Sequence, residues 1–152
     1  LRCLVGSEMC IRDRITDCGP VSGHSAQTQA KLQIMMQYIH DNYSGQITLD
    51  DIAGTVLISK SSVLNIFRIY LHTSPINYVV EYRLKRASKL LVDTENSVCA
   101  IAHETGFENI GYFCRRFKKL YGVTPINYRK YYRSAERNSM RNTHSDTNVL
   151  SG

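Results

Sequence analysis

Long apolar runs are missing from this chain of 152 residues. No run approaches the about 18 apolar residues that predict a transmembrane helix, and Leu1–Arg14 lacks the continuous apolar stretch of a secretory signal. Cysteine pairs with the spacing CxxC are missing as well, and the five cysteines are an odd number. This pattern argues against a disulfide framework and a zinc site. We therefore expect a protein of the reducing cytoplasm with no membrane partner, no metal and no cofactor.

The whole chain has a formal net charge of +6, and one long stretch of it lacks acidic residues. Between Asn109 and Lys130 no aspartate or glutamate occurs. The basic residues of this stretch are Arg115, Arg116, Lys118, Lys119, Arg129 and Lys130. Such a local excess of positive charge suits a polyanionic partner, although many basic proteins bind none.

Strand signals are missing too, and helical periodicity takes their place from about Ala26 onward. The first predicted helix carries Leu32, Met35 and Ile39 on one face and ends at Gly45. Capping residues and glycines mark six further helices, over about 49–56, 60–71, 75–91, 97–104, 109–121 and for a short distance from 125. The sequence therefore predicts an all-α fold of about seven helices.

The core segment of the chain nearly repeats itself. Each copy has a short helix, a tight turn, a longer helix and an exit helix that begins at a Ser-Pro or Thr-Pro pair. The matching positions are Ile52-Ala53 with Ile101-Ala102 49 residues later, Phe67 with Phe117 50 residues later, and Pro75–Tyr78 with the identical Pro125–Tyr128. A small residue in the first helix lets the second helix pack closely across it, which leaves the outer face of the second helix free for a major groove. We predict two homeodomain-like helix-turn-helix subdomains joined by a long linker helix, Pro75–Leu91.

Residues Ile47 to Lys130 resemble the DNA-binding domain of the AraC/XylS family of bacterial transcriptional regulators. The most specific stretch is Val98–Phe107, and the others are 47–53, 83–91, 112–113, 117–119, 122–125 and 128–129. The resemblance implies a sequence-specific transcription regulator that binds double-stranded promoter DNA, reads two adjacent major-groove segments with two recognition helices, and recruits RNA polymerase. Family members usually carry a separate sensing or dimerising domain. We therefore expect this fragment to be monomeric and the full-length protein to be dimeric.

Three regions are predicted along the chain: an unstructured segment 1–25, the double helix-turn-helix domain 26–132, and a disordered tail 133–152. Leu4–Asp13 resembles the translation of adapter DNA from transposase-based sequencing libraries. Leu1–Arg14 is therefore interpreted as a fusion scar, with an ordinary native linker as the alternative. On this interpretation the natural protein begins further upstream.

The predicted DNA-binding residues lie on the outer faces of the two recognition helices. Arg115 is the expected base-reading residue because arginine pairs bidentately with guanine, and Asn65 is expected at adenine. Leu64 and Ile110 are expected at thymine methyl groups. The other predicted contacts are Ser61, Arg68, Gly111 and Cys114, together with Arg116, Lys118 and Lys119 at phosphates.

Some positions depart from the family pattern or carry another expected role. The family usually has glycine where His72 stands, so we predict a left-handed His72 at a helix end. The basic residues of the linker helix are candidates for contact with the DNA backbone: Arg83, Lys85, Arg86 and Lys89. For Arg83 the resemblance instead implies packing or an ion pair.

Two other functions stay open at this point. One is a basic helical adaptor module that binds an acidic protein partner. The other is an enzyme that uses Cys99 and His103, which are spaced i, i+4 on one predicted helix. Neither a third ligand nor an orienting carboxylate completes that pair, so we expect no enzyme, with Cys99 in the core and His103 on the surface.

Overall fold

The computed structural model describes residues 26–143, and their side chains as far as residue 135. Within this range the chain folds into seven helices and no strand, which confirms the predicted all-α class. The helices are α2 (Ala26–Asn42), α3 (Leu49–Thr55), α4 (Lys60–Leu71), α5 (Pro75–Asp93), α6 (Val98–Glu104), α7 (Ile110–Tyr121) and α8 (Pro125–Thr143). No single helix of the described range has the length and apolar content of a membrane span. Only the α3–α4 pair, bent by 87°, reaches them when taken together.

Side-chain caps begin the helices where the sequence predicted them. The hydroxyls of Ser59, Ser74 and Ser97 each accept a hydrogen bond from the backbone N–H three residues on. At α3 the capping box is complete, because the Asp51 carboxylate also accepts from the Thr48 backbone N–H at 2.8 Å. Hydrogen bonds from Thr48 lower the pKa of Asp51. These caps satisfy N–H groups that have no partner inside the helix.

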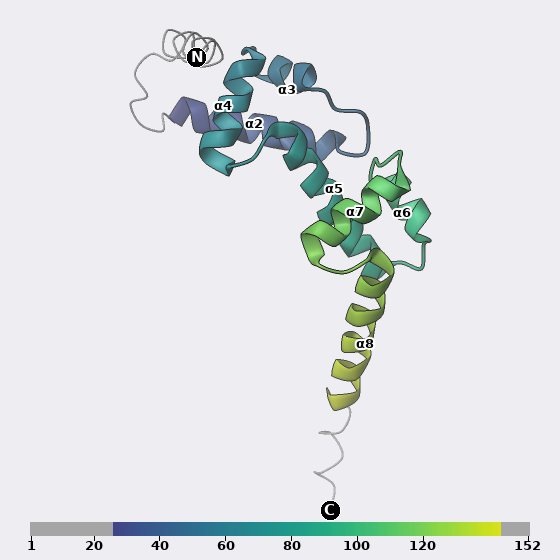
Figure 1. Ribbon diagram of the computed structural model, residues 1–152. Coiled ribbons are helices and arrows are strands. Elements are labelled where there is room, and N and C mark those ends of the chain that lie inside the picture. Colours follow the sequence, from purple (N-terminus) through teal and green to yellow (C-terminus); the bar gives the residue numbers. More distant parts are fainter. Residues whose placement is uncertain (1–25, 144–152) are drawn as a thin grey trace, which may run out of the picture.

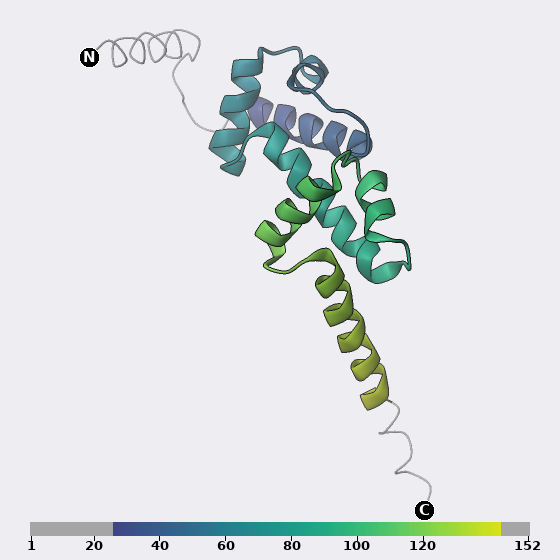
Figure 2. The same cartoon turned by 45° about the vertical axis from the view of Figure 1, so that its right-hand side comes forward.

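Two separate hydrophobic cores divide the molecule into two units. Unit 1 is α2, α3, α4 and the start of α5, and unit 2 is the rest of α5 with α6, α7 and the start of α8. Helix α5 gives Val79 to the first core and Val80, Leu84, Ala87 and Leu91 to the second. In Figures 1 and 2 this helix runs from one unit into the other. The predicted linker helix is therefore part of both cores.

The C-terminal boundary differs from the prediction. Helix α8 was expected to be short, with a disordered tail from residue 133, but it continues to Thr143 and projects beyond both units (Figure 1). The few apolar residues that suggested disorder are equally compatible with a solvated helix. The predicted unstructured segment 1–25, with its suspected scar Leu1–Arg14, lies outside the described residues, as does the tail from residue 144.

Candidate nucleic-acid interface

The two longer helices of the helix-turn-helix units, α4 and α7, lie on one side of the molecule. In both views α4 and α7 lie to the left within their units, and α3 and α6 lie to the right (Figures 1 and 2). Ala53 and Ala102 are buried in α3 and α6, as close crossing of the paired helices requires. Phe67 and Phe117 are fully buried on the inner faces of α4 and α7. The opposite faces of both helices are left without packing partners among the described elements.

The outer face of α7 is basic and exposed. Arg115, Lys118 and Lys119 are exposed there, and Ile110 is 37% exposed at the start of the helix. A Cβ built on Gly111 would lie 3.8 Å from an Nη atom of Arg115. The Arg115 side chain therefore extends back along the helix toward its first turn, as long side chains in helices do. In helix-turn-helix proteins this N-terminal part of the recognition helix meets base edges.

Two predicted contacts on α7 lie at the margin of this face. Cys114 is partly buried and packs against the core of unit 2. Arg116 is also only partly exposed. These two side chains have less access to a partner on the outer face than Arg115 or Lys119 has.

The outer face of α4 is less polar and carries less charge. Ser61, Leu64 and Arg68 are exposed, and Asn65 is partly exposed. Ile69 is 47% exposed on the same helix, although it was not among the predicted site residues. The repeat offset of 50 residues aligns Ile69 with Lys119, and that alignment would have placed Ile69 on the outer face of α4.

Among the described residues, two that carry side chains adopt the left-handed conformation, and both lie in unit 1. His72 ends α4 with φ 53°, which confirms the predicted backbone conformation. Leu57, in the turn between α3 and α4, has φ 52° and was not predicted. The offset of 49 residues aligns it with Gly106, whose φ is 87°. Glycine is the usual residue in this conformation because a Cβ is crowded there.

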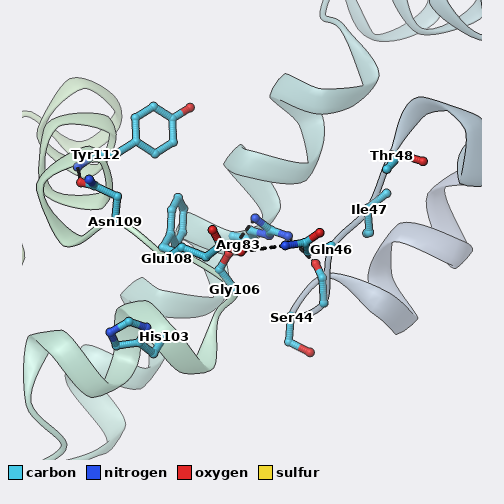
Figure 3. A pocket seen from close by; sticks show the side chains of 12 residues that line it. Ser44, Gln46, Ile47, Thr48, Arg83, His103, Gly106, Glu108, Asn109 and Tyr112 are labelled. Carbon is cyan, nitrogen blue, oxygen red and sulfur yellow. Dashed lines mark hydrogen bonds between the residues drawn. The ribbon is translucent and has the colours of Figure 1, made fainter.

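Arg83 lies between the two units rather than in an ion pair. Its Nε donates to the carbonyl oxygen of Tyr43 at 2.7 Å and its two Nη atoms donate to those of Gly106 at 2.8 Å and Gly45 at 2.6 Å. Burial lowers the pKa of Arg83. Figure 3 shows this guanidinium beside a cavity of about 560 Å³ between the α2–α3 loop and the α6–α7 turn. Of the two expected roles of Arg83, packing is the one observed, because three carbonyl oxygens and no carboxylate of the described residues accept from its guanidinium.

Cys99 was expected in the core, but it is exposed on α6. Helix α6 has seven residues and turns Ile101, Ala102 and in part Val98 to the core, which leaves Cys99 on its solvent side. His103 is exposed, as expected. Within the part of the chain that the structure describes, no three His, Cys, Asp or Glu side chains gather as metal ligands would.

Comparison with known proteins places this arrangement in a family. A family model described as "Helix-turn-helix domain" matches residues 52–131, more than half of the 152 residues. A crystal structure of an AraC-type DNA-binding domain protein from Chromobacterium violaceum superposes with a TM-score of 0.66 at 31% identity, over 70% of this chain and 95% of that one. The chain belongs to the AraC-type helix-turn-helix family.

Curated relatives of this AraC-type domain are regulators. The regulator GbdR of Pseudomonas aeruginosa is 31% identical over 129 residues, which are 82% of this chain and 35% of GbdR. YdeC of Bacillus subtilis, called an uncharacterized HTH-type transcriptional regulator, is 32% identical over 100 residues, 66% of this chain and 34% of YdeC. The chain thus spans about a third of the length of these two relatives. The DNA-binding domain of AdpA, solved with a target DNA, shares the fold with a TM-score of 0.63 at 21% identity, over 69% of this chain and 94% of that one.

Proposed function

We propose that this AraC-type domain is a sequence-specific, double-stranded DNA-binding transcription regulator that reads two adjacent major-groove segments. The observation that carries the proposal is the placement of α4 and α7 on one side of the molecule, each with its outer face exposed. Successive major-groove segments on one face of a duplex are roughly 34 Å apart. The fold shared with the AdpA domain, which was solved on target DNA, supports the same use of the two helices.

The residue types on the two outer faces support a division between base and phosphate contacts. Arg115 has the fork geometry that pairs with guanine, and Asn65 has the amide that pairs with adenine. Leu64 and Ile110 are exposed apolar side chains that suit thymine methyl groups. Arg116, Lys118 and Lys119 would neutralise phosphates, with Ser61, Arg68, Gly111 and Cys114 completing the contact surface.

The proposed setting is a bacterial cytoplasm. The partner is promoter DNA, and bound protein would recruit RNA polymerase there. The domain catalyses no reaction in this proposal, and the relatives it matches are named as regulators. The described domain would act as a monomer, and a longer protein that contains it would dimerise through its other parts.

Selection of binding sites from random duplexes, followed by footprinting, tests the proposal. We expect one discrete protected site with two contacted segments about one helical turn apart. The matched variants are Arg115→Ala and Lys119→Ala. Lys119→Ala removes a proposed phosphate contact, so it should weaken binding to all sequences alike and reduce the salt slope by about one unit. Arg115→Ala removes a proposed base contact, so it should relax the sequence preference at one or two positions.

One outcome would count against this function, and another against the base-reading role of Arg115. Without a selected site or a footprint, DNA reading would be excluded, and tight binding to an acidic protein instead would favour the adaptor function. If Arg115→Ala weakened cognate and random DNA equally, Arg115 would be a phosphate contact. Sequence preference would then rest on apolar contacts and DNA shape.

A further inference from the structure

The hydrogen-bonding pattern of Arg83 on α5 occurs a second time in the molecule. Arg133 on α8 stands 50 residues after Arg83 and donates to the carbonyl oxygens of Val92, at 3.2 Å, and of Thr94. Val92 and Thr94 lie at the end of α5, each 49 residues after Tyr43 and Gly45 at the end of α2. In each unit, therefore, an arginine from the exit helix holds the carbonyl groups that end the entry helix.

The two arginines differ in their other contacts, and Arg133 forms an ion pair with Glu95 in its own unit. Arg83 also donates to the Gly106 carbonyl, which lies in the helix-turn-helix turn of unit 2, whereas its bonds to Tyr43 and Gly45 stay within unit 1. Its Cζ also lies 5.9 Å from the ring centroid of Phe107 in unit 2. The carbonyl bonds of Arg133, by contrast, stay within unit 2. Both arginines hydrogen-bond carbonyl groups within one unit, and Arg83 in addition bonds a carbonyl group of the other unit.

The backbones of the two units meet closely at this point. A Cβ on Gly106 would lie 2.8 Å from the Ser44 carbonyl oxygen and 2.9 Å from that of Tyr43, too close for any side chain. A second bridge runs beside it, where Gln46 Nε2 donates to Glu108 Oε1 at 2.8 Å (Figure 3). The α2–α3 loop of unit 1 is therefore held against the α6–α7 turn that leads into the recognition helix of unit 2.

We infer that Arg83 is a positioning residue that fixes the separation and angle of α4 and α7, and thereby sets which spacing of DNA half-sites the protein accepts. The inference rests on the proposed function. When two binding modules are linked, the second binds with an effective concentration that depends on how well the link matches the span. With a fixed junction, the effective concentration of the second helix is high at one spacing of the DNA half-sites only. With a loosened junction it is lower at that spacing and similar at several others.

The first measurement uses duplexes with the selected half-sites moved apart or together by one and two base pairs. Wild-type protein should lose about tenfold or more in affinity for a two-base-pair change, because the second helix no longer meets its segment. Arg83→Gln should bind the native spacing more weakly and the altered spacings nearly as well, so that this ratio falls to about threefold or less. A wild-type ratio in folded Arg83→Gln would overturn the inference.

Arg133→Gln is the matched control, because it removes the corresponding carbonyl bonds within unit 2, together with the ion pair to Glu95. It should lower the melting temperature as Arg83→Gln does and keep the wild-type spacing ratio. If it reduced the ratio equally, a general loss of stability would explain the result and the inference would be wrong. If Arg83→Gln does not fold, Arg83→Lys decides, because a single ammonium group cannot hold the carbonyl oxygens of both units as the forked guanidinium does. A wild-type ratio in folded Arg83→Lys would then overturn the inference.

A measurement without DNA separates failure of this inference from failure of the proposed function. Residual dipolar couplings of backbone amides report the relative orientation of two bodies. Wild type and Arg133→Gln should fit one alignment tensor for both units, and Arg83→Gln should need two tensors of different magnitude. One shared tensor in Arg83→Gln would contradict the positioning role, whatever the DNA experiments show.

Discussion

The two helix-turn-helix units share one scaffold but fill its two left-handed positions with different residues. Unit 1 has Leu57 at φ 52° and His72 at φ 53°, and unit 2 has Gly106 at φ 87° and Gly122 at φ 77°. Leu57 is 92% exposed, whereas the space at Gly106 is filled by the backbone of unit 1. The comparison shows that the same turn accepts a side chain where it faces solvent and excludes one where another unit packs against it.

The two recognition helices also differ at equivalent positions, in the charge of their outer faces. At equivalent positions, 50 residues apart, the outer face of α4 has Asn65 and Ile69 where that of α7 has Arg115 and Lys119. Two positive charges in unit 2 thus replace an amide and an apolar side chain in unit 1. On the proposed function, unit 2 would make strong electrostatic and guanine contacts, and unit 1 weaker contacts through shape and hydrogen bonds.

The largest expected effect comes from emptying each core in turn. Phe117 has the rings of Tyr121 and Tyr128 at 4.6 and 5.3 Å, and Phe67 has that of Tyr78 at 5.7 Å. Truncating a buried phenylalanine costs about 3–5 kcal/mol of unfolding free energy. We expect Phe117→Ala near the upper end and Phe67→Ala near the lower end in urea titrations.

Hydrogen exchange would show whether the units respond separately. Phe117→Ala should speed amide exchange mainly in α6 and α7, and Phe67→Ala mainly in α3 and α4. Exposed Ile69→Ala is the control and should change little. Equal loss of protection across both units in either core variant would show that the two cores unfold as one.

A smaller effect is expected from removing equivalent base contacts. Arg115→Ala should reduce discrimination at one or two positions of the selected site by about 1–3 kcal/mol, the worth of a bidentate arginine–guanine pair. Asn65→Ala should have the lesser effect, because Asn65 is only partly exposed. Competition binding with singly substituted duplexes measures both. A larger loss for Asn65→Ala would reverse the assignment of stronger contacts to unit 2.

The left-handed positions provide the third test. Leu57→Gly and His72→Gly should each stabilise by up to about 1 kcal/mol, because relief of the strained backbone exceeds the added entropy of the unfolded chain. Gly122→Ala should destabilise by about 1 kcal/mol, and Gly106→Ala by more, because its Cβ would also collide with the Tyr43 and Ser44 carbonyls. Midpoints of urea unfolding provide the comparison. Destabilisation by both glycine substitutions in unit 1 would show that these turns are not strained.

The smallest effect concerns pH. His40 on α2 hydrogen-bonds the Tyr78 hydroxyl at 2.9 Å and stacks on Tyr82, with Asp41 and Lys85 as the nearby charges. Burial lowers the pKa of His40 below its usual 6.5, so the unfolded chain takes up the proton first as pH falls.

The contribution of His40 to the free energy of unfolding should therefore be fully present above about pH 6.5 and decrease as pH falls below it. The change should be about a few tenths of a kcal/mol, because His40 is only partly buried. Unit 2 has exposed Lys89 at the equivalent place, 49 residues on, and should lack this dependence. Melting temperatures of wild type and His40→Gln at pH 7.5 and 5.5 measure the difference. An equal pH response in both proteins would assign it to another group.

The sequence alone determined the features that depend on neighbours along the chain. Thr48 and Asp51 form a capping box between residues three apart, Pro75 begins the linker helix, and the periodic apolar residues Met35 and Ile39 are buried. Capping and amphipathic burial act within one or two helical turns, so their signals are local. The repeat added the pairing of elements and, through the family resemblance, the two recognition helices.

Only the tertiary structure decided what depends on residues far apart in the chain. Arg83 takes acceptors 40 and 23 residues away, and no local pattern predicts those carbonyl oxygens. Cys99 is exposed because α6 turns Ile101 and Ala102 to the core of unit 2. Leu57 adopts its left-handed backbone in the turn that connects α3 and α4, whose side chains share the core of unit 1. Sequence patterns describe which side of an element is apolar. The distance between two packed elements depends on all the side chains between them. That distance determines the junction where the α2–α3 loop of unit 1 meets the α6–α7 turn of unit 2.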